Sequence, residues 1–457
     1  MLMRMTLASG CLLALTGTGN ANELSAKEQL GFSLFFDKNL SLNGNQACAD
    51  CHLPAAGWTG HNSDINAHGA AYEGSVIKRF SNRKPPSAAY AAASPVLHFD
   101  KTEAIFIGGN FWDGRATGEK LGNPAADQAL GPFLNPLEQA LPDNSCVIHR
   151  VCNAEYPVSL DSIWTDACDI AWPDNIQSAC AGETSAQALA VTDRDKVDQA
   201  YAYVGLAIAA FEASTTVNPY TSKYDYYLAG RVKLSEEETR GMELFKGKAK
   251  CAACHPMEPG VNSEPPLFTD FSFDNLGVPR NPENPWYTMP KHFNPQGRQW
   301  VDKGLGEFLA QRDEYRQYAE ENLGKQKVPT VRNVDKRPYE TFVKAYMHNG
   351  YFKTLKGLVN FYNTRDTKPV CKNPLTTEAD ALQQQCWPPA ELTTNVNQEE
   401  LGDLQLSDAE ENAIVVFMQT LSDGYQPPNG VALLRNTQHK SIGVTDDVNQ
   451  AKHPLTH

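Results

Sequence analysis

The sequence predicts a mainly α-helical protein built from two similar halves, with long loops and few short strands. The main observation is an internal repeat, because residues 24–35 and 234–245 share the pattern Leu-Ser-x-x-Glu-x-x-Gly-x-x-Leu-Phe. In both copies a serine precedes a glutamate by three residues, which is the capping box that begins many helices. The 29 prolines and 32 glycines interrupt most other periodic stretches, and this favours long connections.

Each half is expected to close with a second, apolar helix. These helices are expected over residues 204–214 and 413–422. Ser407 and Glu410 supply a third capping box ahead of the second one. We expect the opening and closing helices of each half to pack together.

The two halves are expected to meet near residues 220–233, where polar, tyrosine-rich sequence leads into the second copy of the repeat. This gives a first domain over residues 22–225 and a second over 226–425. The segment 426–457 has no clear apolar period, so we expect it to be a tail on the surface.

The composition excludes some classes of function. The chain carries a formal net charge of −14, whereas a nucleic-acid-binding protein needs a basic face. Beyond the N-terminus, no apolar stretch is long enough for a transmembrane helix. We therefore expect neither a nucleic-acid partner nor a transmembrane segment.

The N-terminus is typical of a signal peptide over residues 1–21. Arg4 supplies a positive charge, an apolar run covers residues 7–15, and small residues lead up to Ala21. The run is too short to span a bilayer, so we expect it to be cleaved on export. The mature protein is therefore expected in an oxidising compartment, the bacterial periplasm.

The cysteines fit such a compartment. Cys11 lies in the signal peptide, and four cysteines belong to two Cys-x-x-Cys-His motifs. An even number remains, which favours disulfides: Cys146, Cys152, Cys168, Cys180, Cys371 and Cys386. We expect Cys371 to pair with Cys386, whereas the pairing of the other four cannot be read from the sequence. A metal site is the alternative, but these cysteines lack its usual close spacing.

The motif Cys-x-x-Cys-His is typical of covalent haem attachment, with two thioether bonds and a histidine on the iron. The expected haem-binding residues are Cys48, Cys51, His52, Cys251, Cys254 and His255. A thioredoxin-like Cys-x-x-Cys pair is the alternative, but it does not explain two motifs that each follow a matching helix. An opening helix, a haem loop and a closing helix make a class I cytochrome c-like domain. We expect two such domains, each with one covalently bound haem.

The other face of each iron decides the function, since a sixth ligand makes an electron-transfer haem and an open face lets peroxide bind. An ordered series of short motifs bears on this choice. It comprises residues 34–41, 85–87, 111–116, 131–138, 268–270, 328–333 and 346–350. As an ordered series they are specific, and the sequence resembles the bacterial di-haem cytochrome c peroxidase superfamily, particularly its MauG-like branch. The resemblance implies a peroxide site at the first haem and electron transfer at the second.

The resemblance also implies catalytic residues at the first haem. Glu138 matches a distal glutamate, whose carboxylate can take a proton from peroxide and return it to the leaving oxygen. Gln128 matches a distal glutamine of MauG-like members, and Pro132 would help to shape the pocket. Trp112 matches a tryptophan that relays electrons between the haems. By themselves, Glu138 and Gln128 would be surface residues and Trp112 a core residue.

The second haem separates the two branches of the superfamily. In the peroxidase branch its sixth ligand is a methionine, fourteen residues after the histidine of a Tyr-x-His-x-Gly motif, and in MauG-like proteins it is a tyrosine. Here that histidine is His348 and the residue fourteen positions later is Tyr362. An anionic tyrosinate favours ferric and higher-valent iron, so a low-potential haem is expected. Met347 is a competing candidate for this ligand, but it lies directly beside His348 rather than fourteen residues after it. Alternatively, Tyr362 could simply be a packed core residue.

The resemblance also bears on a histidine near the first haem and on a calcium ion. His68 lies sixteen residues after His52, where conventional di-haem peroxidases have a histidine that ligates the resting first iron. It could bind the iron here, or it could be a loop histidine beside an iron that is already open. The calcium ion would lie between the domains, held by the Asn82 side chain and by the carbonyl oxygens of Val343 and Ala345.

Together these features predict a periplasmic MauG-like di-haem peroxidase. It would use hydrogen peroxide to form high-valent haem iron and would oxidise a protein or redox-protein substrate. One alternative is a conventional cytochrome c peroxidase that detoxifies hydrogen peroxide with electrons from a small cytochrome or cupredoxin. Another is a non-catalytic di-haem electron carrier with two six-coordinate irons. The cysteine-bearing inserts at 140–185 and 365–400 would form a partner-docking surface or only decorate the exterior.

Overall fold

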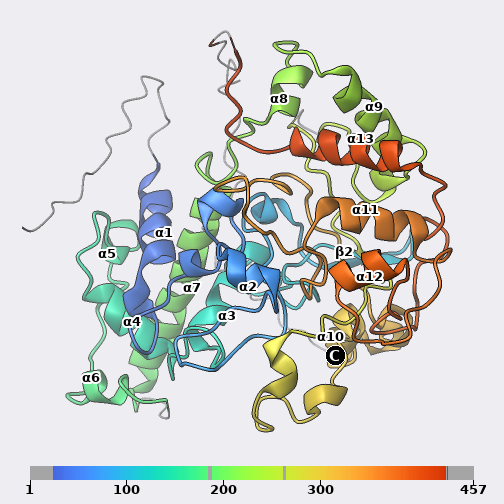
Figure 1. Ribbon diagram of the computed structural model, residues 1–457. Coiled ribbons are helices and arrows are strands. Elements are labelled where there is room, and N and C mark those ends of the chain that lie inside the picture. The colour runs from blue at the N-terminus through green and yellow to red at the C-terminus, as the bar shows by residue number, and fades with distance from the viewer. Residues whose placement is uncertain (1–23, 184–187, 261–263, 429, 431–457) are drawn as a thin grey trace, which may run out of the picture.

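The computed structural model describes residues 24–183, 188–260, 264–428 and 430, and it is mainly helical with few short strands, as predicted (Figure 1). The predicted signal peptide and nearly all of the predicted tail lie outside the described residues. Among the helices that are described, none combines the length and the apolarity needed to cross a bilayer.

The helices follow one another as α1 (Ala26–Phe36), α2 (Ser63–Ala67), α3 (Pro124–Leu134), α4 (Asn144–Cys152), α5 (Leu160–Ile163), α6 (Ile176–Ala179), α7 (Val191–Ala213), α8 (Lys223–Leu228), α9 (Glu236–Lys246), α10 (Gly304–Leu309), α11 (Leu355–Thr364), α12 (Glu378–Gln384) and α13 (Asp408–Gln419). The strands are β1 (His98–Asp100), β2 (Ile105–Ile107), β3 (Phe273–Asp274) and β4 (Gln326–Lys327). They form two antiparallel pairs, β1 with β2 and β3 with β4. In the first pair Phe99 lies opposite Phe106, and in the second Phe273 lies opposite Lys327.

The two copies of the repeat form matching helix pairs. Helix α1 packs against α7 in the first half, and α9 packs against α13 in the second (Figure 1). Ser25, Ser235 and Ser407 each begin their helix with the predicted capping box. The start of three of these four helices is therefore determined by residues that are neighbours in the sequence.

Helix α7 is longer than the apolar segment that predicted it, since it begins at Val191 rather than at residue 204. In the added part Val197, Ala200 and Tyr201 are buried at helical spacing, while most of their neighbours are exposed. The segment is therefore amphipathic, and only its C-terminal part is apolar on most sides.

A glycine stands at the same position of both repeats, where the paired helices approach most closely. A Cβ atom added to Gly31 would lie 2.0 Å from the carbonyl oxygen of Ala207. In the second pair, a Cβ atom on Gly241 would lie 1.9 Å from the carbonyl oxygen of Ala413. Only glycine allows the backbones to come this close.

Replacing Gly241 by alanine is therefore expected to destabilise the second helix pair by about 3 kcal/mol, because the added methyl group must push α9 away from α13. Gly182→Ala is the matched control, since a Cβ there meets nothing within 4 Å. Thermal unfolding of the two variants provides the measurement. Equal melting temperatures would contradict the close approach.

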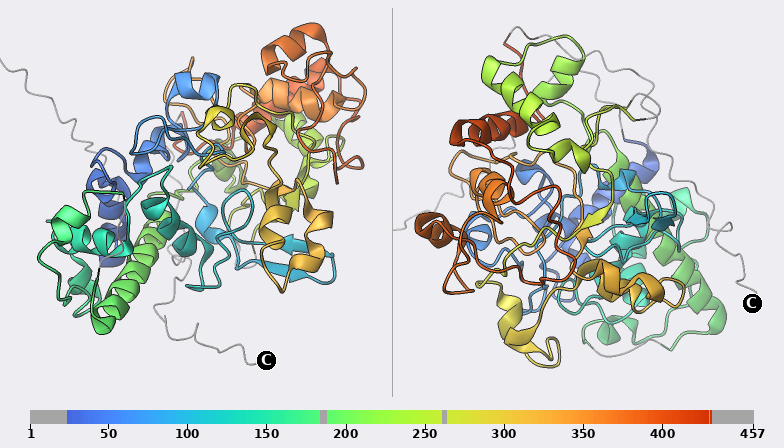
Figure 2. Two further views of the ribbon diagram at one scale, coloured as in Figure 1. Left: turned by 90° about the horizontal axis from the view of Figure 1, so that it is seen from below. Right: turned by 90° about the vertical axis from the view of Figure 1, so that its right-hand side faces the viewer.

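Each half of the molecule has its own hydrophobic core. One extends from Leu30 to Val217 and includes α1, α4 and α7, and the other extends from Tyr224 to Leu421 and includes α11 and α13. The left view of Figure 2 has α1 and α7 on one side and the orange C-terminal helices on the other. The predicted domain limits at 22–225 and 226–425 are compatible with these cores and stay a prediction.

The halves also share a smaller core. Phe106 of the β1–β2 hairpin packs in one cluster with Phe273 of β3 and Leu305 of α10. In the left view of Figure 2 the cyan hairpin lies beside the gold helices that include α10. The two halves are thus joined by apolar packing as well as by the chain itself.

Disulfides close both cysteine-bearing inserts. Cys371 pairs with Cys386, which confirms the predicted bond. In the first insert the pairs are Cys146–Cys180 and Cys152–Cys168. The first insert is therefore tied internally by two nested loops, and α4 contributes one cysteine to each.

Candidate active site

A cavity of about 1210 Å³, partly open to solvent, surrounds the first Cys-x-x-Cys-His motif. Its lining contains the motif residues and all four side chains that the resemblance implies for catalysis: Cys48, Cys51, His52, Trp112, Gln128, Pro132 and Glu138. We call this space the first cavity.

A second cavity, of about 1420 Å³, surrounds the other motif. Cys251, Cys254 and His255 line it, and Tyr362 of α11 lies in the same lining. Trp112 is the candidate residue that contributes to both cavities. The structure thus gathers residues that are distant in sequence into two cavities with one shared tryptophan.

Both motif histidines have the same partner for one ring nitrogen. The Nδ1 atom of His52 lies 3.2 Å from the carbonyl oxygen of Trp58, and that of His255 lies 2.8 Å from the carbonyl oxygen of Phe268. A carbonyl only accepts, so Nδ1 carries the proton and Nε2 keeps its lone pair. This is the arrangement of a metal-binding histidine, and it fits iron in both cavities.

The residues that supply these carbonyls share an unusual backbone. Trp58 has φ of +61° and Phe268 has φ of +54°. Both lie in the left-handed region of backbone conformation, which residues other than glycine rarely adopt. Such strain is often found where a functional group must be oriented. Sequence reasoning missed both residues, because a carbonyl acceptor leaves no mark on residue type.

The four motif cysteines also fit thioether attachment. They are the free cysteines of the described residues, whereas the other six form disulfides. Burial raises the pKa of the Cys48, Cys251 and Cys254 thiols to about 12, so they are not thiolates. Within the described ranges, no three His, Cys, Asp or Glu side chains are grouped to hold a metal ion. The cysteines therefore suit a covalently bound haem better than a thiolate-metal site.

One helix and the turn after it supply the distal residues. Gln128 and Pro132 belong to α3, and the chain turns back after Leu134 so that Glu138 faces the same cavity. The Glu138 Oε1 atom accepts a hydrogen bond of 3.1 Å from the Ser81 hydroxyl. Burial raises the pKa of the Glu138 carboxyl, and the Arg115 guanidinium opposes this shift. A partly buried carboxyl oriented by a hydroxyl can hold and return a proton.

Trp112 is fixed on several sides between the two cavities. Its Nε1–H donates to the carbonyl oxygen of Lys84 at 2.8 Å, and its own carbonyl accepts from the Lys327 amide at 2.8 Å. Its ring meets the His348 ring edge to face, with 6.4 Å between centroids. These contacts hold the indole in one orientation.

A buried ion network lies beside this tryptophan. The Arg83 guanidinium contacts the Asp113 carboxylate at 2.5 Å and the Asp302 carboxylate at 2.6 Å. Asp113 follows Trp112 directly, and Asp302 belongs to the second half of the chain. The network therefore anchors the tryptophan loop to the second half, and removing one partner would leave a buried charge unpaired.

Tyr362 places a partly buried phenol in the second cavity. Burial raises its pKa well above the ordinary value, so the phenol stays protonated unless a cation lies against it. A ferric iron could supply that charge. Met347 and Met418 line the same cavity. Sequence reasoning considered Met347 but missed Met418, which lies on α13 far from the motif.

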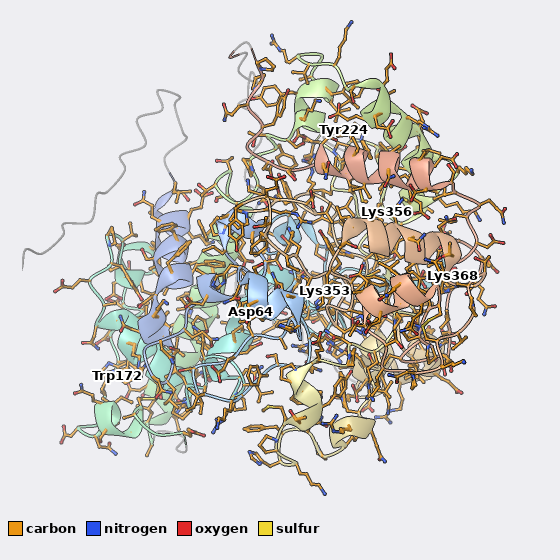
Figure 3. The ribbon with its side chains drawn as sticks, viewed as in Figure 1. Asp64, Trp172, Tyr224, Lys353, Lys356 and Lys368 are labelled. Atoms are coloured by element: carbon orange, nitrogen blue, oxygen red, sulfur yellow. A yellow bond between two sulfur atoms is a disulfide. The ribbon has the colours of Figure 1, made fainter. Side chains whose placement is uncertain are left out.

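His68 lies outside the first cavity. It follows α2, whose Asp64 is labelled in Figure 3 close to Lys353. The His68 side chain is 62% exposed, and its Nδ1 atom lies 3.0 Å from the Glu283 carboxylate. In this structure His68 is therefore a surface residue, and its side chain does not enter the first cavity.

The residues implied for calcium have other partners in this structure. The Val343 carbonyl oxygen accepts a hydrogen bond of 3.0 Å from the Asn66 side chain. The Asn82 carbonyl oxygen accepts one of 2.8 Å from the Asn284 side chain. These bonds leave the Asn82 side-chain oxygen and a second lone pair on each carbonyl oxygen for a cation, so the calcium site stays a prediction.

A family model described as di-haem cytochrome c peroxidase matches residues 25–233, which include the first motif and every distal residue. Residues 25–233 belong to the di-haem cytochrome c peroxidase family. The chain is accordingly a di-haem peroxidase, an oxidoreductase that uses peroxide.

Its relatives in this family are of two kinds. The chain is 29% identical over 435 residues to the methylamine utilization protein MauG of Paracoccus denitrificans, covering 93% of this chain and 97% of that one. It is 28% identical over 348 residues to a cytochrome-c peroxidase of Denitromonas iodatirespirans, covering 74% and 72%. The crystal structure of the diheme peroxidase BthA from Burkholderia thailandensis superposes with a TM-score of 0.65 at 25% identity, covering 87% and 86%.

Proposed function

We propose that this di-haem peroxidase works in the MauG-like manner, with peroxide reacting in the first cavity and the second cavity storing oxidising equivalents. The observation that carries the proposal is the partly buried Tyr362 phenol in the lining of the cavity around the second motif. When bound, each haem supplies a redox-active iron that is alternately oxidised and reduced. Cys48, Cys51, Cys251 and Cys254 would hold the haems covalently, and His52, His255 and Tyr362 would bind the irons.

Glu138 is the proposed acid–base residue for peroxide. Its carboxylate takes the proton from one peroxide oxygen and delivers it to the other, so that the departing oxygen leaves as water. The Ser81 hydroxyl orients the carboxylate, and burial brings its pKa closer to neutral pH, where such a group both accepts and returns a proton. Gln128 donates or accepts a hydrogen bond across the same space, and Pro132 excludes water from its edge.

Trp112 is the proposed relay between the two sites. It borders both cavities, and its hydrogen bonds to the backbone hold the indole still while an electron passes. Electrons would thus move from the second cavity toward the first and be replaced from outside. The external donor is proposed to be a periplasmic protein side chain, a small cytochrome or a cupredoxin.

The periplasm is the proposed location. Three disulfides close the inserts, and such bonds persist in oxidising compartments rather than in a reducing cytoplasm. The predicted signal peptide supports the same location.

A second candidate function is conventional peroxide detoxification. Met347 and Met418 line the second cavity, and a methionine ligand would raise the reduction potential of that haem. His68 would then ligate the first iron at rest and move away on reduction. The exposed position of His68 favours the MauG-like proposal over this one.

Adding peroxide to the oxidised protein, without any reductant, distinguishes the two functions. The MauG-like proposal expects an immediate reaction and a long-lived near-infrared absorption band, because the first cavity is open and the second site shares the oxidation. A protein that reacts only after prior reduction by one electron would instead support the conventional function. The absorption spectrum in the near infrared is the measurement.

A further inference from the structure

The second cavity has a carboxyl in its lining that the peroxide chemistry does not use. This is Glu391, whose side chain is only 5% exposed. Burial and, after it, the Asp302 carboxylate raise the pKa of Glu391 to about 7, although Arg280 opposes the shift. The Arg280 Nε atom lies 3.6 Å from Glu391 Oε1, which is beyond hydrogen-bond distance. Such a carboxyl can take up a proton near neutral pH and give it back.

The phenol of Tyr287 is hydrogen-bonded to this carboxyl. Its hydroxyl donates to Glu391 Oε1 at 3.1 Å, so the phenol lies one hydrogen bond away from the lining of the second cavity. Only 6% of Tyr287 is exposed, and burial raises the pKa of the phenol above its ordinary value. The Arg280 guanidinium lies over the ring, 4.1 Å from its centroid. This cation disfavours a positively charged ring, so the phenol loses an electron most easily when Glu391 takes its proton.

The tyrosine belongs to an aromatic cluster that extends toward the exterior. Tyr287 and Trp286 are buried and pack in one cluster with the partly buried Trp300. The ring centroids of Tyr287 and Trp300 are 6.1 Å apart, and those of Trp286 and Trp300 are 5.9 Å apart. Arg298 and Gln299, directly before Trp300, are exposed. The cluster therefore connects a residue of the cavity lining with the surface.

We propose that Tyr287 and Trp300 form an exit through which a protein donor at the surface is oxidised by the second cavity. The proposal rests on the proposed function, which stores oxidising equivalents in that cavity. First, Tyr287 gives one electron to the oxidised site and its hydroxyl proton to the Glu391 carboxylate, which leaves a neutral tyrosyl radical. Next, Trp300 gives one electron to this radical while Glu391 returns the proton. The external donor then reduces the indole radical cation of Trp300.

Radical trapping in the full-length, haem-loaded protein tests the exit. Peroxide is added with a nitroso spin trap and no external donor, and the trapped residues are identified by mass spectrometry. An adduct at Trp300 is expected in the wild-type protein and should be lost in Tyr287→Phe. Tyr339→Phe, at an exposed tyrosine, is the matched control and should keep it. A wild-type protein without the adduct, or an adduct that persists in Tyr287→Phe, would overturn the proposal.

The variant Trp300→Phe tests the order of the two steps. The oxidation can then no longer leave Tyr287, so freeze-quench electron paramagnetic resonance should detect a tyrosyl radical that accumulates. Trp172→Phe, at a partly exposed tryptophan of the first insert, should not change the radical signal of the wild-type protein (Figure 3). A Trp300→Phe protein without a tyrosyl radical would overturn the proposal.

The proton acceptor is tested in the same background. Glu391→Gln keeps the size of the side chain but cannot take the phenol proton, so adding it to Trp300→Phe should abolish the tyrosyl radical. The haem content and melting temperature should match those of Trp300→Phe, which a merely structural role of Glu391 would not predict. A radical of unchanged intensity would remove Glu391 from the exit.

The near-infrared band separates this proposal from the proposed function. The band reports oxidation shared between the two cavities and does not involve Tyr287, so it should form equally in the wild-type protein and in Tyr287→Phe. Loss of the band from both proteins would contradict the MauG-like function. A normal band without the Trp300 adduct would overturn the exit alone. If Tyr287→Phe does not fold, the adduct in the wild-type protein decides.

Discussion

Glu138→Gln is expected to slow peroxide turnover by roughly 10²–10⁴-fold, the usual contribution of general acid–base catalysis. The amide keeps the shape of the side chain and its contact with the Ser81 hydroxyl, but it can no longer take a proton from peroxide. Stopped-flow measurement of peroxide consumption provides the rate. The haem content and the resting spectrum should match those of the wild-type protein.

Glu103→Gln is the matched control, since Glu103 lies exposed on the turn between β1 and β2. Its rate should equal that of the wild-type protein. If Glu138→Gln also reacts within about twofold of the wild-type rate, the acid–base role of this residue is lost. The reduction of peroxide would then need another proton carrier in the first cavity.

Tyr362→Met is expected to raise the reduction potential of the second haem by a few tenths of a volt, because a neutral thioether replaces an anionic phenolate on the iron. The near-infrared band formed with peroxide should disappear, since the second site would no longer share the oxidation. A potentiometric titration followed by absorbance measures the potential. Tyr339→Met, at an exposed tyrosine, should leave it unchanged.

If the reduction potential of the second haem is unchanged in Tyr362→Met, a side chain other than Tyr362 binds that iron. Met418 and Met347 are the candidates, since both line the second cavity. In that case Met418→Leu or Met347→Leu should change the potential instead. The pair of experiments therefore identifies the ligand in either outcome.

The helical parts of the fold could be predicted because their signals are local. Each capping box occupies four consecutive residues, and the glycine of each repeat belongs to the same short pattern. The Cys371–Cys386 bond could also be predicted, because the two cysteines lie close together in one insert. In these cases the residues that decide the structure are neighbours in the chain.

Other features could not be predicted because they depend on backbone atoms or on distant segments. The Trp58 and Phe268 carbonyls orient the histidines whatever their side chains are. The buried Lys344 side chain donates a hydrogen bond to the carbonyl oxygen of Ala56, which lies 288 residues away in the chain. The pairing of four cysteines in the first insert needed the three-dimensional path of the chain.

The electron paramagnetic resonance and absorption spectra of the oxidised, haem-loaded protein test the central claim most directly. If Tyr362 ligates the second haem and the first iron is open, the spectra will contain one high-spin haem and one low-spin haem with histidine and tyrosine ligands. Two low-spin haems, with the charge-transfer band of a methionine–iron bond, would contradict the account.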